Sequence, residues 1–176
     1  FLLQGLGDHY PGMARDLYAA EPVFREWVDR AASITTPLLG RDFREVFFAA
    51  PAGAPGGPDL RRMVGRAAGT AGEPGTPLVH AAVFALDHAL ARLLMDWGIR
   101  PQALLGYSLG EYVAACLAGV FAFEDAVAVV AERARWIDGL AAGALLAVPL
   151  PEEETLARLG PDLWLAALNG RAATVV

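Results

Sequence analysis

The 176-residue sequence predicts an α/β fold, and three observations lead to this prediction. Short apolar runs at 1–3 and 103–107 are typical of buried strands, and segments with helical periodicity lie between and after them. A Gly-x-Ser-x-Gly motif at 106–110 follows the second run and precedes an alanine-rich helical segment, as in a nucleophile elbow. Beyond Gly139 the pattern changes to short strands around one short helix, which indicates a smaller α+β unit.

The N-terminal elements are placed by periodicity and by proline and glycine. The strand at 1–3 is followed by a glycine-broken loop at 4–8. Helical periodicity covers 13–33, where Pro22 marks a break or a new start. Residues 51–77 contain five prolines and seven glycines, which predicts a loop or surface excursion rather than a core element.

A long helix is predicted over 78–97, with Gly98 as its C-cap. Charged and imidazole side chains interrupt this helix, so we expect no membrane span; they are His80, Asp87, His88, Arg92 and Asp96. Further helices are predicted at 109–118 and at about 124–138, on either side of Gly119.

The second unit is predicted to hold strands at 144–148, 163–168 and 172–176 and a helix at 152–159. The working boundary gives two domains, residues 1–139 with the candidate nucleophile and residues 140–176. The chain opens on Phe1 and ends inside an expected strand, so we expect it to be a piece of a larger polypeptide.

Composition excludes several classes of function. The net charge is −6 and no block of Lys or Arg occurs, which argues against a nucleic-acid partner. The single cysteine, Cys116, cannot support a disulfide framework, which is typical of a reducing, cytoplasmic location. We expect Cys116 to be a small core residue.

Ser108 is the candidate nucleophile. A sharp turn between strand and helix lifts a serine hydroxyl clear of the backbone, and flanking glycines let the two elements approach closely. The helix N-terminus behind the serine favours developing negative charge. The alternative is that Ser108-x-x-Glu111 is only a helix capping box, which the sequence also fits.

Arg133 is the second candidate. It falls on the predicted apolar stripe of the 124–138 helix; the stripe consists of Ala126, Val127, Val130, Ala134 and Ile137. A buried guanidinium keeps its charge and needs an anionic partner or a wet pocket. That partner is either an internal acid such as Glu111, or the carboxylate of a substrate acyl group, which its planar fork matches. A third possibility is that Arg133 snorkels past the edge of the stripe.

Four stretches together resemble the acyltransferase family of polyketide and fatty-acid synthases, the malonyl-CoA:acyl carrier protein transacylases. Residues 1–13 resemble the family's F-x-F-P-G-Q-G-x-Q…G-M opening, and residues 106–112 its G-H-S-x-G-E-Y elbow. Residues 118–133 continue to match the family's pattern at the same spacing, and residues 167–176 resemble its A-x-N-G-P-x-x-x-V-V strand pair. Tyr107 stands where the family usually has histidine, and Leu6 and His9 replace two glutamines.

The resemblance implies an α/β-hydrolase-like large subdomain and the beginning of a ferredoxin-like small subdomain. Ser108 would take an acyl group from coenzyme A and pass it to the phosphopantetheine thiol of an acyl carrier protein. The backbone N–H groups of Leu6 and Leu109 would form the oxyanion hole, and Arg133 would grip the carboxylate of a malonyl-type extender unit. Neighbouring synthase domains, such as a ketosynthase, are expected partners, and no metal or cofactor is expected in the domain itself.

The general base of this family is a histidine that comes far downstream of the serine, beyond this chain. We therefore expect residues 1–176 alone to be inactive. Of the histidines present, His88 is predicted to lie on the surface and His80 to be structural, while His9 follows the loop expected beside the serine.

Two other functions remain open from the sequence. One is a serine hydrolase of the esterase, thioesterase or patatin-like type, since the elbow is shared chemistry. Such an enzyme would have no use for Arg133 on a buried face. The other is a non-catalytic remnant domain of a synthase, which would keep the fold without using Ser108.

Overall fold

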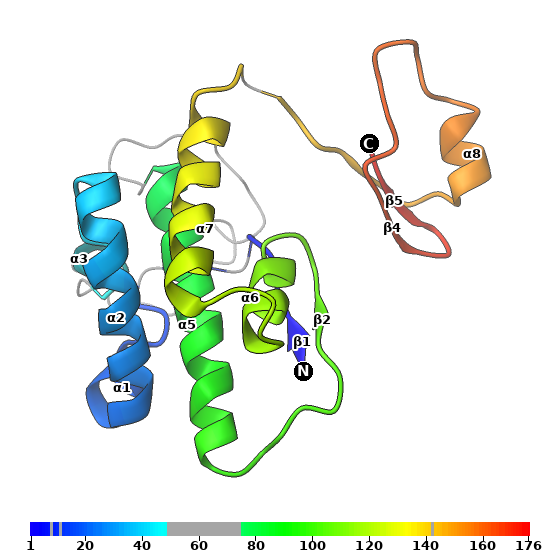
Figure 1. Ribbon diagram of the computed structural model, residues 1–176. Helices are drawn as coiled ribbons and strands as arrows, with labels where there is room; N and C mark the ends of the chain where they lie inside the picture. The colour runs from blue at the N-terminus through cyan, green and yellow to red at the C-terminus, as the bar shows by residue number, and fades with distance from the viewer. Residues whose placement is uncertain (8, 11, 49–74, 142) are drawn as a thin grey trace, which may run out of the picture. The chain divides into compact units, whose positions relative to one another are not determined.

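The computed structural model describes residues 1–7, 9–10, 12–48, 75–141 and 143–176 (Figure 1). The chain divides into two compact units, Phe1–Gly139 and Leu140–Val176. The excursion predicted at 51–77 lies outside the described residues, apart from 75–77, where a helix begins.

The first unit has the predicted α/β fold. Its strands β1 (Leu2–Leu3) and β2 (Leu105–Gly106) pair in parallel, with Leu2 opposite Leu105 and Leu3 opposite Gly106. The helices are α1 (Arg15–Ala20), α2 (Pro22–Leu39), α3 (Phe43–Phe47), α5 (Thr76–Asp96), α6 (Gly110–Leu117) and α7 (Phe123–Asp138).

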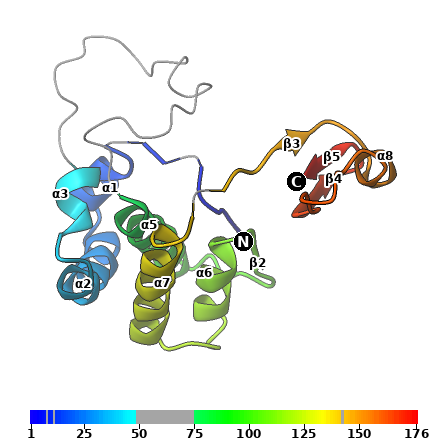
Figure 2. The ribbon, with the colours of Figure 1, turned by 90° about the horizontal axis from the view of Figure 1, so that it is seen from above.

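The core of the first unit lies among α2, α5 and α7, which pack side by side (Figures 1 and 2). Helix α5 is buried around most of its circumference, including Phe84 and Leu93. By length and apolar content α5 would also suit a membrane, but 72% of its most apolar window is buried inside the protein. Its hydrophobicity is therefore explained by its central place in the core.

The helix predicted over 13–33 is two helices. Pro22 starts α2 at its first turn, where the missing N–H costs no hydrogen bond. Helix α2 then continues to Leu39, past the predicted end, and stops at Gly40 in the left-handed region. Helix α3 was not predicted; it has five residues, too few for a periodic pattern, and its cap is Asp42, whose side chain accepts from the Arg44 backbone N–H at 2.8 Å.

The prediction that His88 lies on the surface is wrong. Its side chain is 3% exposed and packs among the rings of Trp27, Phe84 and Phe123, with centroid distances of 4.9, 6.1 and 4.6 Å. Arg92, on the same helix, lies over the Trp27 ring at 4.7 Å instead of marking a solvated face. The ring cluster joins α2, α5 and α7.

The second unit is a three-stranded antiparallel sheet with one short helix. Its elements are β3 (Ala147–Val148), α8 (Glu152–Leu156), β4 (Ala167–Gly170) and β5 (Ala173–Val175), with strand order β3-β5-β4. The strand predicted at 163–168 begins later, because its backbone pairing with β5 starts only at Ala166. That this unit opens a ferredoxin-like subdomain stays a prediction.

Candidate active site

Ser108 stands in the turn between β2 and α6. Its side chain is exposed, and its φ angle of 52° lies in the left-handed region, which non-glycine residues seldom adopt. Such a residue carries roughly 1–3 kcal/mol of strain and persists only where its surroundings enforce it. The conformation is that of a nucleophile elbow.

The two glycines of the motif allow the elements around Ser108 to approach each other. A Cβ at Gly106 would collide with the Glu111 backbone N in the first turn of α6, and a Cβ at Gly110 would collide with the Leu3 carbonyl oxygen of β1. Only glycine fits at either position, because the colliding atoms belong to backbone. The motif thus joins β1, β2 and α6 in one tight junction.

The structure does not show the capping box that the sequence allowed. The N-cap of α6 is Leu109, which makes no side-chain cap bond. The Glu111 backbone N–H donates to the Ser108 carbonyl oxygen at 3.1 Å, so it is the backbone of Ser108 and not its hydroxyl that closes this turn. The hydroxyl is left available for chemistry.

The loop after β1 lies against the elbow. A Cβ built on Gly5 would be 2.9 Å from the Tyr107 carbonyl oxygen and 3.1 Å from the Ser108 Cβ. Leu6 is the next residue along this loop, and Leu109 is the residue after the serine, buried at 1% exposure. The two predicted oxyanion donors therefore come from two chain segments that meet at Ser108.

Arg133 lies on α7, half-buried, and contacts α5 and α6. Its Nη1 is 3.4 Å from Nδ1 of His80, and its guanidinium lies 5.5 Å from the centre of the Tyr112 ring. Among the described residues, none of the carboxylates, Glu111 included, forms an ion pair with Arg133. The predicted stripe is correct at Ala126, Val127, Val130 and Ala134, whereas Ile137, at 36% exposure, lies at its edge.

Tyr112 connects Arg133 to the elbow. It stands in the first turn of α6, the helix that directly follows the turn bearing Ser108. Sequence reasoning named Tyr112 only as the last residue of the elbow motif and gave it no role.

His80 and His9 bring two more imidazoles to this region. Burial, then the charges of Arg133 and His9, lower the pKa of His80 to about 4. His80 is therefore neutral near pH 7. His9 is half-buried in the loop beyond Leu6, and its charge acts on His80.

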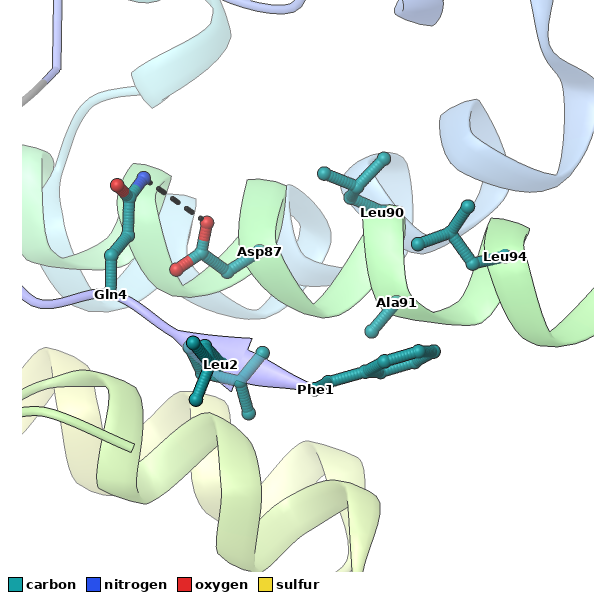
Figure 3. Close-up of a pocket in the computed structure, with 8 residues that line it drawn as sticks. Phe1, Leu2, Gln4, Asp87, Leu90, Ala91 and Leu94 are labelled. Carbon is teal, nitrogen blue, oxygen red and sulfur yellow. Dashed lines mark hydrogen bonds between the residues drawn. The ribbon is translucent and has the colours of Figure 1, made fainter. Parts of the chain in front are cut away.

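A separate pocket of about 330 Å³ lies between β1 and α5 (Figure 3). Its polar residues are Gln4 and Asp87, joined by a hydrogen bond of 3.4 Å from Gln4 Nε2, and burial raises the pKa of Asp87 to about 6. The other lining residues are apolar: Phe1, Leu2, Leu3, Leu90, Ala91 and Leu94. Neither Ser108 nor Arg133 lines this pocket.

An α/β unit with a strained serine between paired glycines defines a protein with a nucleophile elbow. The family described as acyl transferase domain matches residues 1–176, so the chain belongs to the acyl transferase domain family.

The curated relatives include proteins named as polyketide synthases. The spectinabilin polyketide synthase system protein NorB of Streptomyces orinoci is 40% identical over 181 positions, which cover 100% of this chain and 8% of NorB. The mycoketide-CoA synthase of Mycobacterium tuberculosis is 35% identical over 177 positions, covering 100% of this chain and 4% of that protein.

Two solved structures resemble the fold closely. The acyl transferase domain of SpnD, in complex with 2-(pent-4-yn-1-yl)malonyl, matches with a TM-score of 0.82 and 40% identity, over 99% of this chain and 38% of that chain. MCAT from Streptococcus pneumoniae matches with a TM-score of 0.72 and 30% identity, over 99% of this chain and 53% of that chain. The chain thus spans between a third and roughly half of these structures.

Proposed function

We propose that this chain carries the nucleophile of an acyltransferase that moves a malonyl-type unit from coenzyme A to the phosphopantetheine thiol of an acyl carrier protein. The setting would be a cytoplasmic polyketide or fatty-acid synthase, with neighbouring domains such as a ketosynthase. Membership of the acyl transferase domain family and the polyketide synthase relatives support this setting.

The observation that carries the malonyl part of the proposal is that, within the described part of the chain, no acidic side chain pairs with Arg133. A guanidinium cannot lose its proton, and its two described contacts, His80 and Tyr112, supply no negative charge. A substrate carboxylate would provide the missing charge in a bidentate geometry. An acetyl group would leave Arg133 partly buried and without an anion, which disfavours it. A simple esterase would have no use for this arrangement.

Ser108 would act in two steps. Its Oγ attacks the thioester carbonyl carbon and loses its proton to a general base, and the tetrahedral intermediate then expels the coenzyme A thiolate, which takes up a proton. The carrier protein thiol attacks the acyl-serine in the same way and restores the Ser108 hydroxyl. Each step passes through an oxyanion, for which the N–H groups of Leu6 and Leu109 are the proposed donors; one well-placed donor is worth about 10²–10³ in rate.

The general base is proposed to lie outside residues 1–176. His88 is enclosed by aromatic rings, and His80 contacts Arg133, so neither is disposed to take the Ser108 proton. We therefore expect this segment alone to load acyl groups poorly and not to turn over.

The test is acyl loading of the complete polypeptide that contains this segment. The polypeptide is incubated briefly with malonyl-CoA or acetyl-CoA, and the mass added to it is measured. We expect a malonyl adduct that disappears in Ser108→Ala and falls at least tenfold in Arg133→Ala, because a charge-assisted pair is lost.

The matched control is Arg135→Ala on the same helix, since Arg135 is exposed and pairs with Glu132 at 2.8 Å. Its loading should stay at the wild-type level. Undiminished malonyl loading in Arg133→Ala, or equal loading of malonyl and acetyl groups by the wild type, would refute the proposed substrate class. A malonyl adduct that persists in Ser108→Ala would refute the proposed nucleophile.

A further inference from the structure

His80 faces Arg133 from the first turns of α5. It is 3% exposed, and its Nδ1 lies 3.4 Å from Nη1 of Arg133 on α7. Because a guanidinium has only donors, this hydrogen bond requires an unprotonated Nδ1 on His80. The ring is then the neutral tautomer with its proton on Nε2.

The surroundings keep that tautomer in place. Among the described residues, the charged groups that act on His80 are Arg133 from α7 and His9 from the loop after β1, and both oppose a second proton on the ring. Burial acts in the same direction. His80 therefore offers Arg133 an acceptor without offering it a negative charge.

Tyr112 provides the second support. Its ring, on α6, lies 5.5 Å from the guanidinium carbon of Arg133. The guanidinium is thus held by one neutral acceptor and one aromatic face. An acidic residue in the place of His80 would hold Arg133 as well, but it would satisfy the charge that a substrate carboxylate is meant to meet.

We propose that His80 is a positioning residue for substrate selection: it orients Arg133 by a neutral hydrogen bond and so leaves the positive charge available to the acyl carboxylate. This inference rests on the proposed function, since it assigns His80 a part in the same site. It predicts that the preference for malonyl over acetyl groups depends on an acceptor at position 80.

The test compares His80→Gln, His80→Leu and His80→Phe in the complete polypeptide. The rates of Ser108 acylation by malonyl-CoA and by acetyl-CoA are measured over a range of concentrations. We expect His80→Leu and His80→Phe to lower kcat/KM for malonyl-CoA by roughly tenfold or more, mainly by raising KM. Neither side chain can accept a hydrogen bond from the charged guanidinium of Arg133. Acetyl loading should not change, and Gln, which keeps an acceptor, should stay within about threefold of the wild type.

His88→Leu is the matched control, because it removes a second buried imidazole from α5 that does not contact Arg133. It should lower thermal stability but leave the malonyl-to-acetyl ratio unchanged. This ratio is measured within one sample, so a smaller folded fraction does not alter it. If His80→Leu does not fold, His80→Phe serves in its place, because it also lacks a hydrogen-bond acceptor.

Three results would overturn the inference. The first is an unchanged malonyl-to-acetyl ratio in His80→Leu and His80→Phe, and the second is an equal fall in loading for both substrates. The third is a His80→Gln variant that is as impaired as His80→Leu. Arg133→Ala is measured in parallel to separate the two proposals. Loss of preference in Arg133→Ala with none in the His80 variants would refute the role of His80 alone. Retained preference in Arg133→Ala would refute the proposed function itself.

Discussion

Ser108 occupies a conformation that its own chemistry does not favour. Its φ of 52° is enforced by a junction in which Gly106 and Gly110 let strand and helix backbones meet. The left-handed conformation costs a non-glycine residue about 1–2 kcal/mol, whereas glycine adopts it freely. At this position we therefore expect glycine to give a more stable protein than alanine, which is the reverse of the usual order.

We expect Ser108→Gly to be more stable than Ser108→Ala by about 0.5–1 kcal/mol, because the relief of strain exceeds the added chain entropy. The measurement is denaturant unfolding of both variants. Ser33, on the exposed side of α2, is the control with the opposite sign: there Gly should be about 1 kcal/mol less stable than Ala. A Gly variant at 108 that is less stable than Ala would show that the turn is not strained.

Gly110 is expected to tolerate no side chain. A Cβ there meets the Leu3 carbonyl oxygen, and backbone cannot move aside as a side chain can. Gly110→Ala should therefore lower the free energy of unfolding by roughly 1–3 kcal/mol or more, as measured by denaturant unfolding. Gly139→Ala is the control, since its Cβ would stay 3.5 Å from the nearest atom, the Trp136 carbonyl oxygen. Equal effects of the two changes would contradict the close approach.

For single residues, the sequence predicted local conformation well, but it did not predict contacts between helices. The turn geometry of Ser108 follows from a local motif; the helix after it was predicted to within one residue, and the strand before it is shorter than the predicted 103–107. The contact between His80 and Arg133 joins residues 53 positions apart on two helices, and periodicity cannot pair two helices. His88 was placed on the surface because Arg92 shares its face, but Arg92 lies over an aromatic ring.

Helix α5 is the element on which both buried histidines depend. It packs against α2 and α7 and presents His80 toward Arg133 and His88 toward Trp27 and Phe123. Burial, then the charges of Arg92 and Arg30, lower the pKa of His88 to about 3. His88 must stay neutral to remain buried among the helices. The stability of the folded protein should therefore fall as the pH is lowered.

The sign of this effect follows from the two pKa values of His88. Its pKa is about 3 in the folded chain and about 6.5 in the unfolded chain, so between these values the unfolded chain binds the extra proton. Lowering the pH from 7 to 4.5 should then cost roughly 2 kcal/mol of stability through this residue. His88→Phe should show a correspondingly smaller loss over the same range, as measured by unfolding at each pH.

Other titrating groups do not confuse this comparison. Asp87 has a raised pKa of about 6, so its effect on stability has the opposite sign, and His80 also titrates. Both residues are present in the wild type and in His88→Phe, so their contributions cancel in the difference between the two proteins. An identical pH dependence in the wild type and in His88→Phe would mean that His88 is not buried as described.

Element boundaries differ in how far sequence alone determines them. Helices α5 and α7 were predicted within about two residues, because long apolar periodicity and glycine at the end are strong signals. Strand β4 was misplaced, since its start depends on where β5 pairs with it, and that is a long-range choice.

The whole molecule consists of units with unequal cores. Within the described part of residues 140–176, the buried side chains are two threonines, Thr155 and Thr174, whose hydroxyls are 2.8 Å apart. Several large apolar side chains of this unit are exposed: Leu140, Leu145, Leu146, Leu156, Leu163, Trp164 and Leu168. Burial of apolar surface is the main source of stability, so this unit has little of its own.

Amide hydrogen exchange of residues 1–176 should reflect this inequality. We expect the slowest exchange in α2, α5 and α7 and exchange at least about a hundredfold faster in β3, β4 and β5, because the latter open without breaking a core. The peptide 140–176 alone should show no cooperative thermal transition. Comparable protection in both units would contradict the prediction.

The pairing of β1 with β2 has a consequence for the order in which the protein is made. Leu2 is synthesised long before its partner Leu105, and at about 5–20 residues per second the wait lasts several seconds. During this time the loop bearing Leu6 has no elbow to lie against. The newly made chain must therefore keep an apolar strand out of wrong pairings, and Ser108 acquires its surroundings only when the two distant segments join.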